Sequence, residues 1–224
     1  MIKGCIFDLD GTLLDTVATI AHYGNYALSA HGYATASVDS YRYFAGNGAR
    51  KLVERMLVHA NAYTEDAFSR VYATYMKAYD ASPLHLTRPF DGIFTLLDFL
   101  KGCGVKIAVL SNKPDSATRP IVEHFFPNAF SYITGSRDGV ALKPAPDGVY
   151  AIMDALSLRP EDTLFVGDTG VDMETGKNAG LRAVGCLWGF RDEDELRSLG
   201  ADYIVCHPHE IITLVEKENG TNEN

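Results

Sequence analysis

The sequence predicts an α/β protein in which a parallel sheet, covered by helices on both faces, is interrupted by an all-helical insertion. Strands and helices alternate from residue 83 to residue 216, and this alternation is typical of parallel sheets with right-handed crossovers. No strand pattern interrupts residues 16–82, although a buried strand precedes that stretch. We therefore expect a core of residues 1–15 and 83–216, an insertion of residues 16–82 and a disordered polar tail at residues 217–224.

The first expected element is a short buried strand over residues 2–7, which ends at Asp8-Leu9-Asp10-Gly11. Side chains alternate along a strand, so Asp8 and Asp10 should leave its end on the same side. Gly11 allows the backbone to turn tightly there. Two carboxylates this close call for a raised pKa or for a hard cation such as Mg²⁺. Either Asp alone would be interpreted as a turn or cap residue.

Three helices are expected in the insertion. The first runs from Val17 to about Gly32, the second covers roughly residues 52–60, and the third follows Thr64, a suitable N-cap residue. The third helix has apolar residues spaced as i, i+3, i+4, i+7, i+8 and i+11, which predicts packing against other helices. These residues are Phe68, Val71, Tyr72, Tyr75, Met76 and Tyr79.

In the second part of the core, expected strands alternate with expected helices. A helix should begin at Pro114 and be kinked or restarted by Pro120, and Gly180 should end a later helix. The expected helices are residues 93–100, 149–156, 171–179 and 211–215, and the expected strands are residues 105–110, 132–135, 163–166, 182–187 and 203–205.

Polar clusters follow the expected strands at four points, and ligands of such sheets bind at the carboxyl ends of the strands. After Asp8 and Asp10, the second cluster is Ser111-Asn112-Lys113, where a hydroxyl and backbone amides could hold a phosphate oxygen or simply cap a helix. The third is Lys143, which lies in a loop stiffened by two prolines. The fourth contains Asp168 and Asp172, four residues apart on one helical face, so one could bind a metal while the other orients Lys143.

In this order, the four clusters resemble the motifs of the haloacid dehalogenase-like hydrolases: D-x-D-G-T, a strand-end Ser or Thr, a Lys, and G-D-x-x-x-D. The resemblance implies a Rossmann-like core. It also implies that Asp8 attacks phosphorus and that Asp10 is the general acid and base. Mg²⁺ would be held by the Asp8 carboxylate, the Asp10 backbone carbonyl and Asp168. The implied phosphate-binding residues are Gly11, Thr12, Ser111, Asn112 and Lys143, with Asp172 supporting Lys143.

The insertion resembles the helical cap of this family, which closes over the active site and contributes specificity. Its loop at Gly46, Asn47, Gly48 and Arg50 opens a helix and forms a reasonable anion site, although a plain turn with solvated basic residues is the alternative. This loop, residues 88–92 and residues 188–190 resemble segments of phosphoglycolate phosphatases. The loop would then receive the carboxylate of a small phosphorylated acid.

Composition restricts the possible partners. The net charge of −9 opposes general binding to nucleic acid or to anionic membranes. Scattered cysteines, of which Cys5, Cys103 and Cys186 adjoin apolar runs, suggest buried reduced thiols and a cytoplasmic location. No signal segment or membrane span is expected, and the chain should be a monomer or homodimer acting on a small phosphorylated metabolite.

The expected function is that of a Mg²⁺-dependent phosphomonoester hydrolase, most readily a phosphoglycolate phosphatase. Alternatives with the same plan are a pyrophosphatase and a sugar-phosphate phosphatase or phosphomutase. A catalytically idle binding module is an alternative from another class. Such a module should lack an essential group, whereas Asp8, Asp10, Ser111, Lys143 and Asp168 are all present.

Overall fold

The computed structural model describes residues 1–220, and the chain divides into two compact units. The core unit holds Met1–Leu14 and the chain from Pro89 onward, and the helical unit is Asp15–Arg88. The chain passes from one unit to the other twice, through β2 (Leu14–Asp15) and β3 (Arg88–Pro89), and these two strands pair with each other. The insertion is therefore entered and left through one small sheet.

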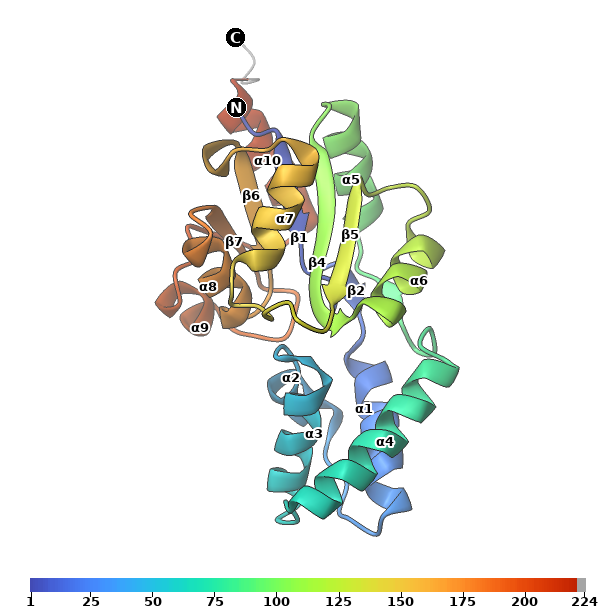
Figure 1. Ribbon diagram of the computed structural model, residues 1–224. Helices are drawn as coiled ribbons and strands as arrows, with labels where there is room; N and C mark the ends of the chain where they lie inside the picture. Colours follow the sequence, from blue (N-terminus) through green and yellow to red (C-terminus); the bar gives the residue numbers. More distant parts are fainter. Residues whose placement is uncertain (221–224) are drawn as a thin grey trace. The chain divides into compact units, whose positions relative to one another are not determined.

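The core unit is built on a six-stranded parallel sheet in the order β5-β4-β1-β6-β7-β8 (Figure 1). All residues of β1 and β6 are buried, as expected for a parallel sheet that is covered on both faces. Phe7 is in register with Val109 of β4 and Val166 of β6, so the residues that follow all three strands emerge at one edge. The strands are β1 Gly4–Phe7, β4 Lys106–Pro114, β5 Tyr132–Ser136, β6 Thr163–Gly167, β7 Arg182–Cys186 and β8 Tyr203–Val205.

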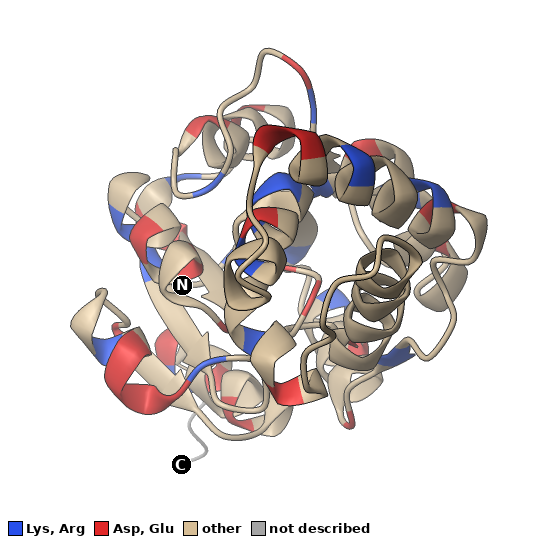
Figure 2. Ribbon diagram, turned by 90° about the horizontal axis from the view of Figure 1, so that it is seen from below, with Lys and Arg blue, Asp and Glu red and all other residues tan. Residues whose placement is uncertain are grey.

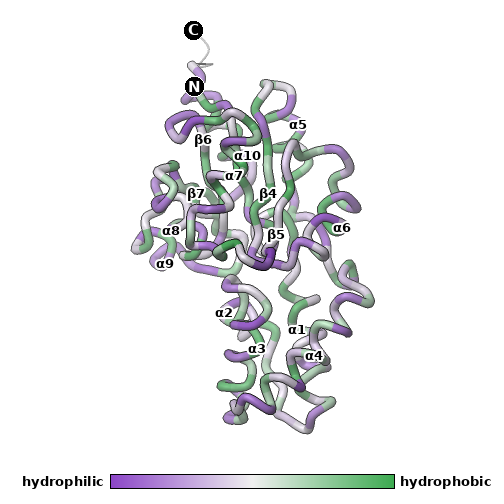
Figure 3. Tube along the Cα trace, viewed as in Figure 1, coloured by the Kyte–Doolittle hydropathy of each residue, from purple (hydrophilic) through white to green (hydrophobic). Residues whose placement is uncertain are grey.

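Helices cover both faces of this sheet, with α7 in front of it and α5 and α10 behind it in Figure 1. Under α7, Val149 and Ile152 join Ile6, Leu110 and Phe165 in one buried cluster, and Figure 3 shows the strands as largely hydrophobic segments. The helices of this unit are α5 Ile93–Gly102, α6 Asp115–Phe125, α7 Asp147–Leu156, α8 Gly170–Asn178, α9 Glu193–Ser198 and α10 Pro208–Asn219, with a 3₁₀ turn at Pro160–Asp162.

The helical unit consists of α1 Val17–Ala30, α2 Val38–Phe44, α3 Gly48–His59 and α4 Glu65–Ala81. The Thr64 hydroxyl accepts a hydrogen bond from the Ala67 amide at 3.0 Å, which confirms the predicted cap of α4. Gly24 is required on α1 because a Cβ there would lie 2.4 Å from the buried ring of Tyr41. In the predicted stripe of α4, Phe68, Val71, Tyr75 and Tyr79 are buried.

Two short helices, α2 and α9, were not predicted. They have seven and six residues and bury only Tyr41 with Phe44 and Leu196, respectively, so their hydrophobic periodicity is weak. Side-chain caps at Ser37 and Asp192 begin them. The predicted restart at Pro120 is wrong, because α6 continues through this residue. A proline removes one hydrogen bond of the helix, and the buried residues on either side still anchor it.

Three predicted boundaries are also wrong. Asp15 and residues 83–88 belong to the helical unit, where the Thr19 hydroxyl donates to the His85 carbonyl at 2.6 Å. The predicted disorder is wrong for residues 217–219, because α10 continues to Asn219. Glu218 forms a 2.8 Å ion pair with Arg182 and thereby fixes the last turn. Residues 221–224 of the predicted tail lie outside the described residues.

The four cysteines are free thiols. Cys5 and Cys186 are buried as predicted, and burial raises the pKa of the Cys5 thiol to about 12. The predicted burial of Cys103 is wrong, because this residue follows the last turn of α5 and is exposed.

Charged residues of both signs are interspersed along the described chain, as Figure 2 shows. Among the helices of residues 1–220, none is both long enough and apolar enough to cross a bilayer.

Candidate active site

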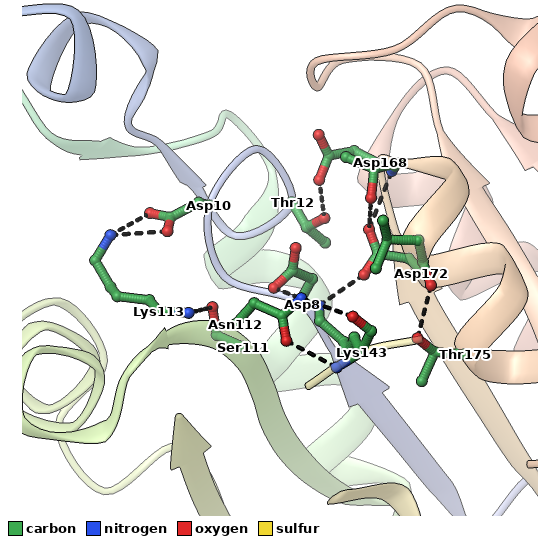
Figure 4. Close-up of polar contacts among 12 residues, drawn as sticks. Asp8, Asp10, Thr12, Ser111, Asn112, Lys113, Lys143, Asp168, Asp172 and Thr175 are labelled. Carbon is green, nitrogen blue, oxygen red and sulfur yellow. Dashed lines mark hydrogen bonds and ion pairs between the residues drawn. The ribbon is translucent and has the colours of Figure 1, made fainter. Parts of the chain in front are cut away.

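The predicted site residues of the core unit come from the carboxyl ends of three neighbouring strands. Asp8 follows β1, Ser111 and Asn112 lie in the last part of β4, and Asp168 follows β6. Because β1 lies between β4 and β6 in the sheet, these ends meet at its centre. Lys143 joins them from the loop before α7 (Figure 4).

Lys143 lies between two buried carboxylates. Its Nζ is 2.9 Å from Oδ1 of Asp8 and 2.7 Å from Oδ1 of Asp172, and all three side chains are almost fully buried. The other oxygen of Asp172 accepts hydrogen bonds from the amide and hydroxyl of Thr169, which fixes it in the first turn of α8. Burial raises the pKa of Asp8 to about 7, against the opposing effect of Lys143. Burial alone would lower the pKa of Lys143, but Asp172 and Asp8 outweigh it and raise that pKa.

Asp168 is held by the turn after β1 and by the loop after β7. Its Oδ1 accepts a hydrogen bond from the Thr12 hydroxyl at 2.7 Å, and its Oδ2 accepts one from the Phe190 amide at 2.8 Å. Glycines allow this close approach, since a Cβ on Gly11 or Gly189 would lie 2.2 Å from an Asp168 atom. Gly11 also has φ of +89°, which favours glycine. Burial raises the pKa of Asp168 as well.

Asp8, Asp168 and Asp172 form a buried cluster that suits a hard cation. Each offers one carboxylate oxygen, and these oxygens lie within 4.8 Å of one another. Carboxylate oxygens are the ligands that Mg²⁺ prefers, and a dication would offset the cost of burying several like charges. The predicted ligands were the Asp8 carboxylate, the Asp10 backbone carbonyl and Asp168. The carboxylate cluster contains Asp8 and Asp168 and adds Asp172, whereas the Asp10 side chain turns toward Lys113 (Figure 4). The Asp10 carbonyl as a metal ligand stays a prediction.

The Asn112 side chain makes hydrogen bonds to the Lys143 backbone that the sequence did not predict. Its side-chain amide donates to the Lys143 carbonyl at 3.0 Å and accepts from the Lys143 amide at 2.9 Å. These two bonds fix the backbone of Lys143 across 31 residues of sequence. The Ser111 hydroxyl accepts from the Lys113 amide at 3.2 Å. Ser111, Asn112 and Lys143 also line a cavity of about 30 Å³, enough for one water molecule.

Gly11 and Thr12 were expected to bind phosphate. In the structure, the Gly11 amide donates to the Leu14 carbonyl at 2.8 Å, and the Thr12 amide approaches the Leu9 carbonyl at 3.4 Å. The indole of Trp188 donates to the Thr12 carbonyl at 3.0 Å. These bonds stabilise the turn after β1, and the role of Gly11 and Thr12 as phosphate ligands stays a prediction.

The predicted specificity loop lies in the helical unit, where Gly48 begins α3 and Asn47 precedes it. The Arg50 guanidinium lies 4.9 Å from the ring centroid of Phe68 and 5.5 Å from that of Tyr72, a cation–π arrangement. The residue that organises the loop is Arg55, which the sequence analysis did not single out.

Arg55 donates to the Phe44 carbonyl at 2.9 Å and to Oδ1 of Asn47 at 2.8 Å. Its position on α3, five residues after Arg50, gave no signal of these backbone contacts. The roles of Gly46, Asn47, Gly48 and Arg50 in substrate recognition stay predictions.

The packing around Asp168 leads to a first testable prediction. Gly189→Ala should displace the Asp168 carboxylate, because the new Cβ would lie 2.2 Å from its Cβ. We expect a loss of about 1–3 kcal/mol in the free energy of unfolding in urea, as for other overpacked sites. Added Mg²⁺ should raise the thermal unfolding midpoint of the variant only at roughly 10-fold higher concentration than it does for the unmodified protein.

Gly102→Ala is the matched control, since nothing lies within 4 Å of a Cβ at this position. This variant should stay within about 1 kcal/mol of the unmodified protein and keep the same Mg²⁺ response. Equal behaviour of the two variants would contradict the role assigned to Gly189.

The chain is similar to several known proteins. A family model described as haloacid dehalogenase-like hydrolase matches residues 5–186. The phosphoglycolate phosphatase of Aquifex aeolicus is 32% identical to this chain and covers 94% of it and 95% of its own length. An N-acetylmuramic acid 6-phosphate phosphatase of Pseudomonas aeruginosa is 29% identical, over 96% of each protein.

Among solved structures, a protein from Lactobacillus delbrueckii subsp. bulgaricus that is provisionally called a phosphoglycolate phosphatase superimposes with a TM-score of 0.92. It is 30% identical, and the match covers 95% of this chain and 98% of that one. The predicted fold class is confirmed by this likeness and by the observed parallel sheet.

Proposed function

The chain belongs to the haloacid dehalogenase-like hydrolases, and on that premise we propose that it is a Mg²⁺-dependent phosphoglycolate phosphatase. The observation that carries this proposal is the buried cluster of Asp8, Lys143, Asp168 and Asp172 at the centre of the sheet edge. Its members are the residues at which the family motifs occur in the sequence. The prediction of a phosphatase is in accord with the relatives named above.

We assign the nucleophile to Asp8. One of its oxygens would form a bond to phosphorus while the bond from phosphorus to the leaving oxygen breaks, which gives an aspartyl-phosphate. A proton from the Asp10 carboxyl would pass to the leaving oxygen. Asp10 would then take a proton from water as the water oxygen attacks phosphorus. The bond from phosphorus to the Asp8 oxygen would break, which frees the Asp8 carboxylate and releases inorganic phosphate.

Lys143 and the residues around it support the phosphoryl group in this scheme. Its ammonium already lies at the nucleophile, 2.9 Å from Asp8, and could pair with a phosphoryl oxygen. Asn112 fixes the backbone of Lys143 and Asp172 fixes its ammonium, so the cation is positioned before substrate binds. The Ser111 hydroxyl and the Asn112 amide are the further phosphate ligands that we propose.

The residues present fit a Mg²⁺ site. Asp8, Asp168 and the Asp10 backbone carbonyl would hold the ion, with Asp172 close to it. When bound, the ion would neutralise charge on the phosphoryl oxygens. Thr12, Phe190 and the two glycines keep Asp168 turned toward this position.

Relatives support the choice of substrate. The curated phosphoglycolate phosphatase from Aquifex aeolicus matches nearly the whole chain. The N-acetylmuramic acid 6-phosphate phosphatase also matches over its length and favours a second candidate, a larger phosphorylated sugar acid. Both named substrates carry a carboxylate besides the phosphate. We therefore propose a small phosphorylated carboxylic acid as the substrate class.

A cytoplasmic location stays a prediction.

The proposed function is tested by phosphate release from a panel of substrates, with Mg²⁺ and then with EDTA. The panel contains 2-phosphoglycolate, N-acetylmuramic acid 6-phosphate, pyrophosphate, glucose phosphates and nucleotides. We expect the highest kcat/KM for 2-phosphoglycolate and loss of turnover in EDTA, with recovery when Mg²⁺ is restored.

A preference for N-acetylmuramic acid 6-phosphate would replace the first candidate by the second. Broad, weak activity would keep the chemistry but overturn the substrate. Phosphate transfer that needs a sugar bisphosphate would indicate a mutase. Absence of turnover on every compound would contradict the proposal.

A further inference from the structure

Lys113 forms a close pair with Asp10 that the proposed chemistry does not yet use. Its Nζ lies 2.7 Å from Oδ2 and 3.0 Å from Oδ1 of Asp10, so the ammonium contacts both carboxylate oxygens (Figure 4). The side chains of Lys113 and Asp10 are only 8% and 17% exposed. Such a mostly buried contact with both oxygens restricts rotation of the carboxylate far more than an exposed pair would.

The backbone of Lys113 is anchored on both sides of its Cα. Its amide donates to the Ser111 hydroxyl at 3.2 Å, and its carbonyl accepts from the Thr118 hydroxyl at 3.1 Å. The backbone of Lys113 is thus fixed by β4 and the first turns of α6. The fixed backbone and the contact of the ammonium with both oxygens together define where the Asp10 carboxylate lies.

Each of the two aspartates of the first motif pairs with a different lysine. Lys143 binds Asp8 together with Asp172, and Lys113 binds Asp10. In Figure 4, the Asp8 and Asp10 side chains accordingly point to different groups although they are two residues apart. This separation keeps the proton-transferring carboxylate out of the buried cluster of Asp8, Asp168 and Asp172.

We propose that Lys113 is a positioning residue that holds the Asp10 carboxylate at the place from which it serves the leaving oxygen. The inference rests on the proposed function and adds a residue to it. Lys113 acts through Asp10 and makes no bond to the reacting atoms. It matters in the first step because the bond from Asp8 to phosphorus forms and the bond to the leaving oxygen breaks as that oxygen receives a proton. Asp10 would take up this proton on one oxygen before the step and donate it, while its other oxygen keeps the contact with Lys113.

This role predicts a dependence on the leaving group. An alkoxide leaving from 2-phosphoglycolate needs the proton, whereas p-nitrophenolate leaves without one. The value of kcat/KM reports the steps up to the departure of the leaving group, so it isolates this effect from later hydrolysis of the aspartyl-phosphate. A general acid typically contributes about 10²–10⁴-fold to the rate, and loss of its orientation should remove a sizeable part of that.

The first experiment compares Lys113→Met with the unmodified enzyme on 2-phosphoglycolate and on p-nitrophenyl phosphate. We expect kcat/KM to fall about 10- to 100-fold for the alkyl ester and less than about 3-fold for the aryl ester. Lys113→Arg keeps a cation and should recover most of the loss. Lys106→Met is the matched control at the exposed start of the same strand, and both its values should stay unchanged.

The second experiment repeats Lys113→Met in an Asp10→Asn background. If Lys113 acts through Asp10, the second substitution should change kcat/KM for 2-phosphoglycolate by less than about 2-fold, because the effects share one cause. A loss that persists in this background would show that Lys113 binds substrate directly, and it would overturn the inference. Equal losses on the alkyl and aryl esters in the first experiment would overturn it as well.

These outcomes are distinct from failure of the proposed function. The comparison needs only one alkyl and one aryl phosphate that the unmodified enzyme hydrolyses, so it remains valid if another alkyl phosphate of the panel is the true substrate. Thermal unfolding of each variant shows whether it is folded. Should Lys113→Met fail to fold, Lys113→Gln takes its place in both experiments, with the same expected losses.

Discussion

Asp8→Asn is expected to lower the kcat for phosphate release by about 10⁴-fold or more while leaving the protein folded. The amide has nearly the same shape as the carboxylate, but it is a far weaker nucleophile. Lys143 loses the charge of Asp8 in this variant but keeps its 2.7 Å ion pair with Asp172, and one like charge leaves the buried cluster of Asp8, Asp168 and Asp172, so the protein should stay folded. The measurement is phosphate release from 2-phosphoglycolate, with thermal unfolding as the test of folding.

Asp98→Asn is the matched control, because it removes the same charge from an exposed position on α5. It should keep full activity. Mass spectrometry of acid-quenched enzyme adds a direct test, since the unmodified protein should carry a phosphoryl group during turnover and the Asp8 variant should not. Retained activity or retained labelling in Asp8→Asn would refute the assignment of the nucleophile.

Lys143→Met is expected to have the largest effect on stability. Lys143 is the cation between Asp8 and Asp172, and its removal leaves these buried carboxylates without their partner. Breaking a buried ion pair by removing one partner typically costs about 3–5 kcal/mol, and we expect a loss of this order in the free energy of unfolding. Urea unfolding without added Mg²⁺ measures it, and turnover should also be lost.

Two companion variants make this prediction specific. Lys77→Met removes a lysine from an exposed position on α4 and should change stability by less than about 0.5 kcal/mol. Lys143→Met combined with Asp172→Asn should recover part of the lost stability, because the second change removes an unpaired carboxylate. A loss below about 1 kcal/mol in the single variant would show that the cluster does not depend on the Lys143 charge.

Local patterns predicted which residues gather at one edge of the sheet, because the topology of the sheet fixes where the strands end. Asp8, Ser111 and Asp168 each follow or end an apolar run in the sequence, and parallel strands bring such ends to one edge of a sheet. The alternation of strands and helices likewise predicted the parallel sheet, and the long stripe on α4 predicted helix packing. Short elements such as α2 and α9 escaped prediction because too few of their residues are buried to reveal a period.

Contacts between residues far apart in the sequence decided which partners the site residues have. Asp10 meets Lys113 across 103 residues, Thr12 meets Asp168 across 156, and no local pattern links the members of either pair. The sequence marked Asn112 through its position after Ser111, but only the structure shows that its side chain fixes the backbone of Lys143.

By itself, the sequence determined the fold class, the family and the residues that gather at the sheet edge, because these depend on local periodicity and on motif order. The tertiary structure decided the partners of those residues. Gly189 is required because Asp168 occupies the space where its Cβ would be, and Asp10 faces Lys113 because β4 brings that ammonium beside the turn after β1. Such contacts depend on how the strands align and how the side chains pack. Both are defined only in the folded chain, because the paired residues are far apart in the sequence.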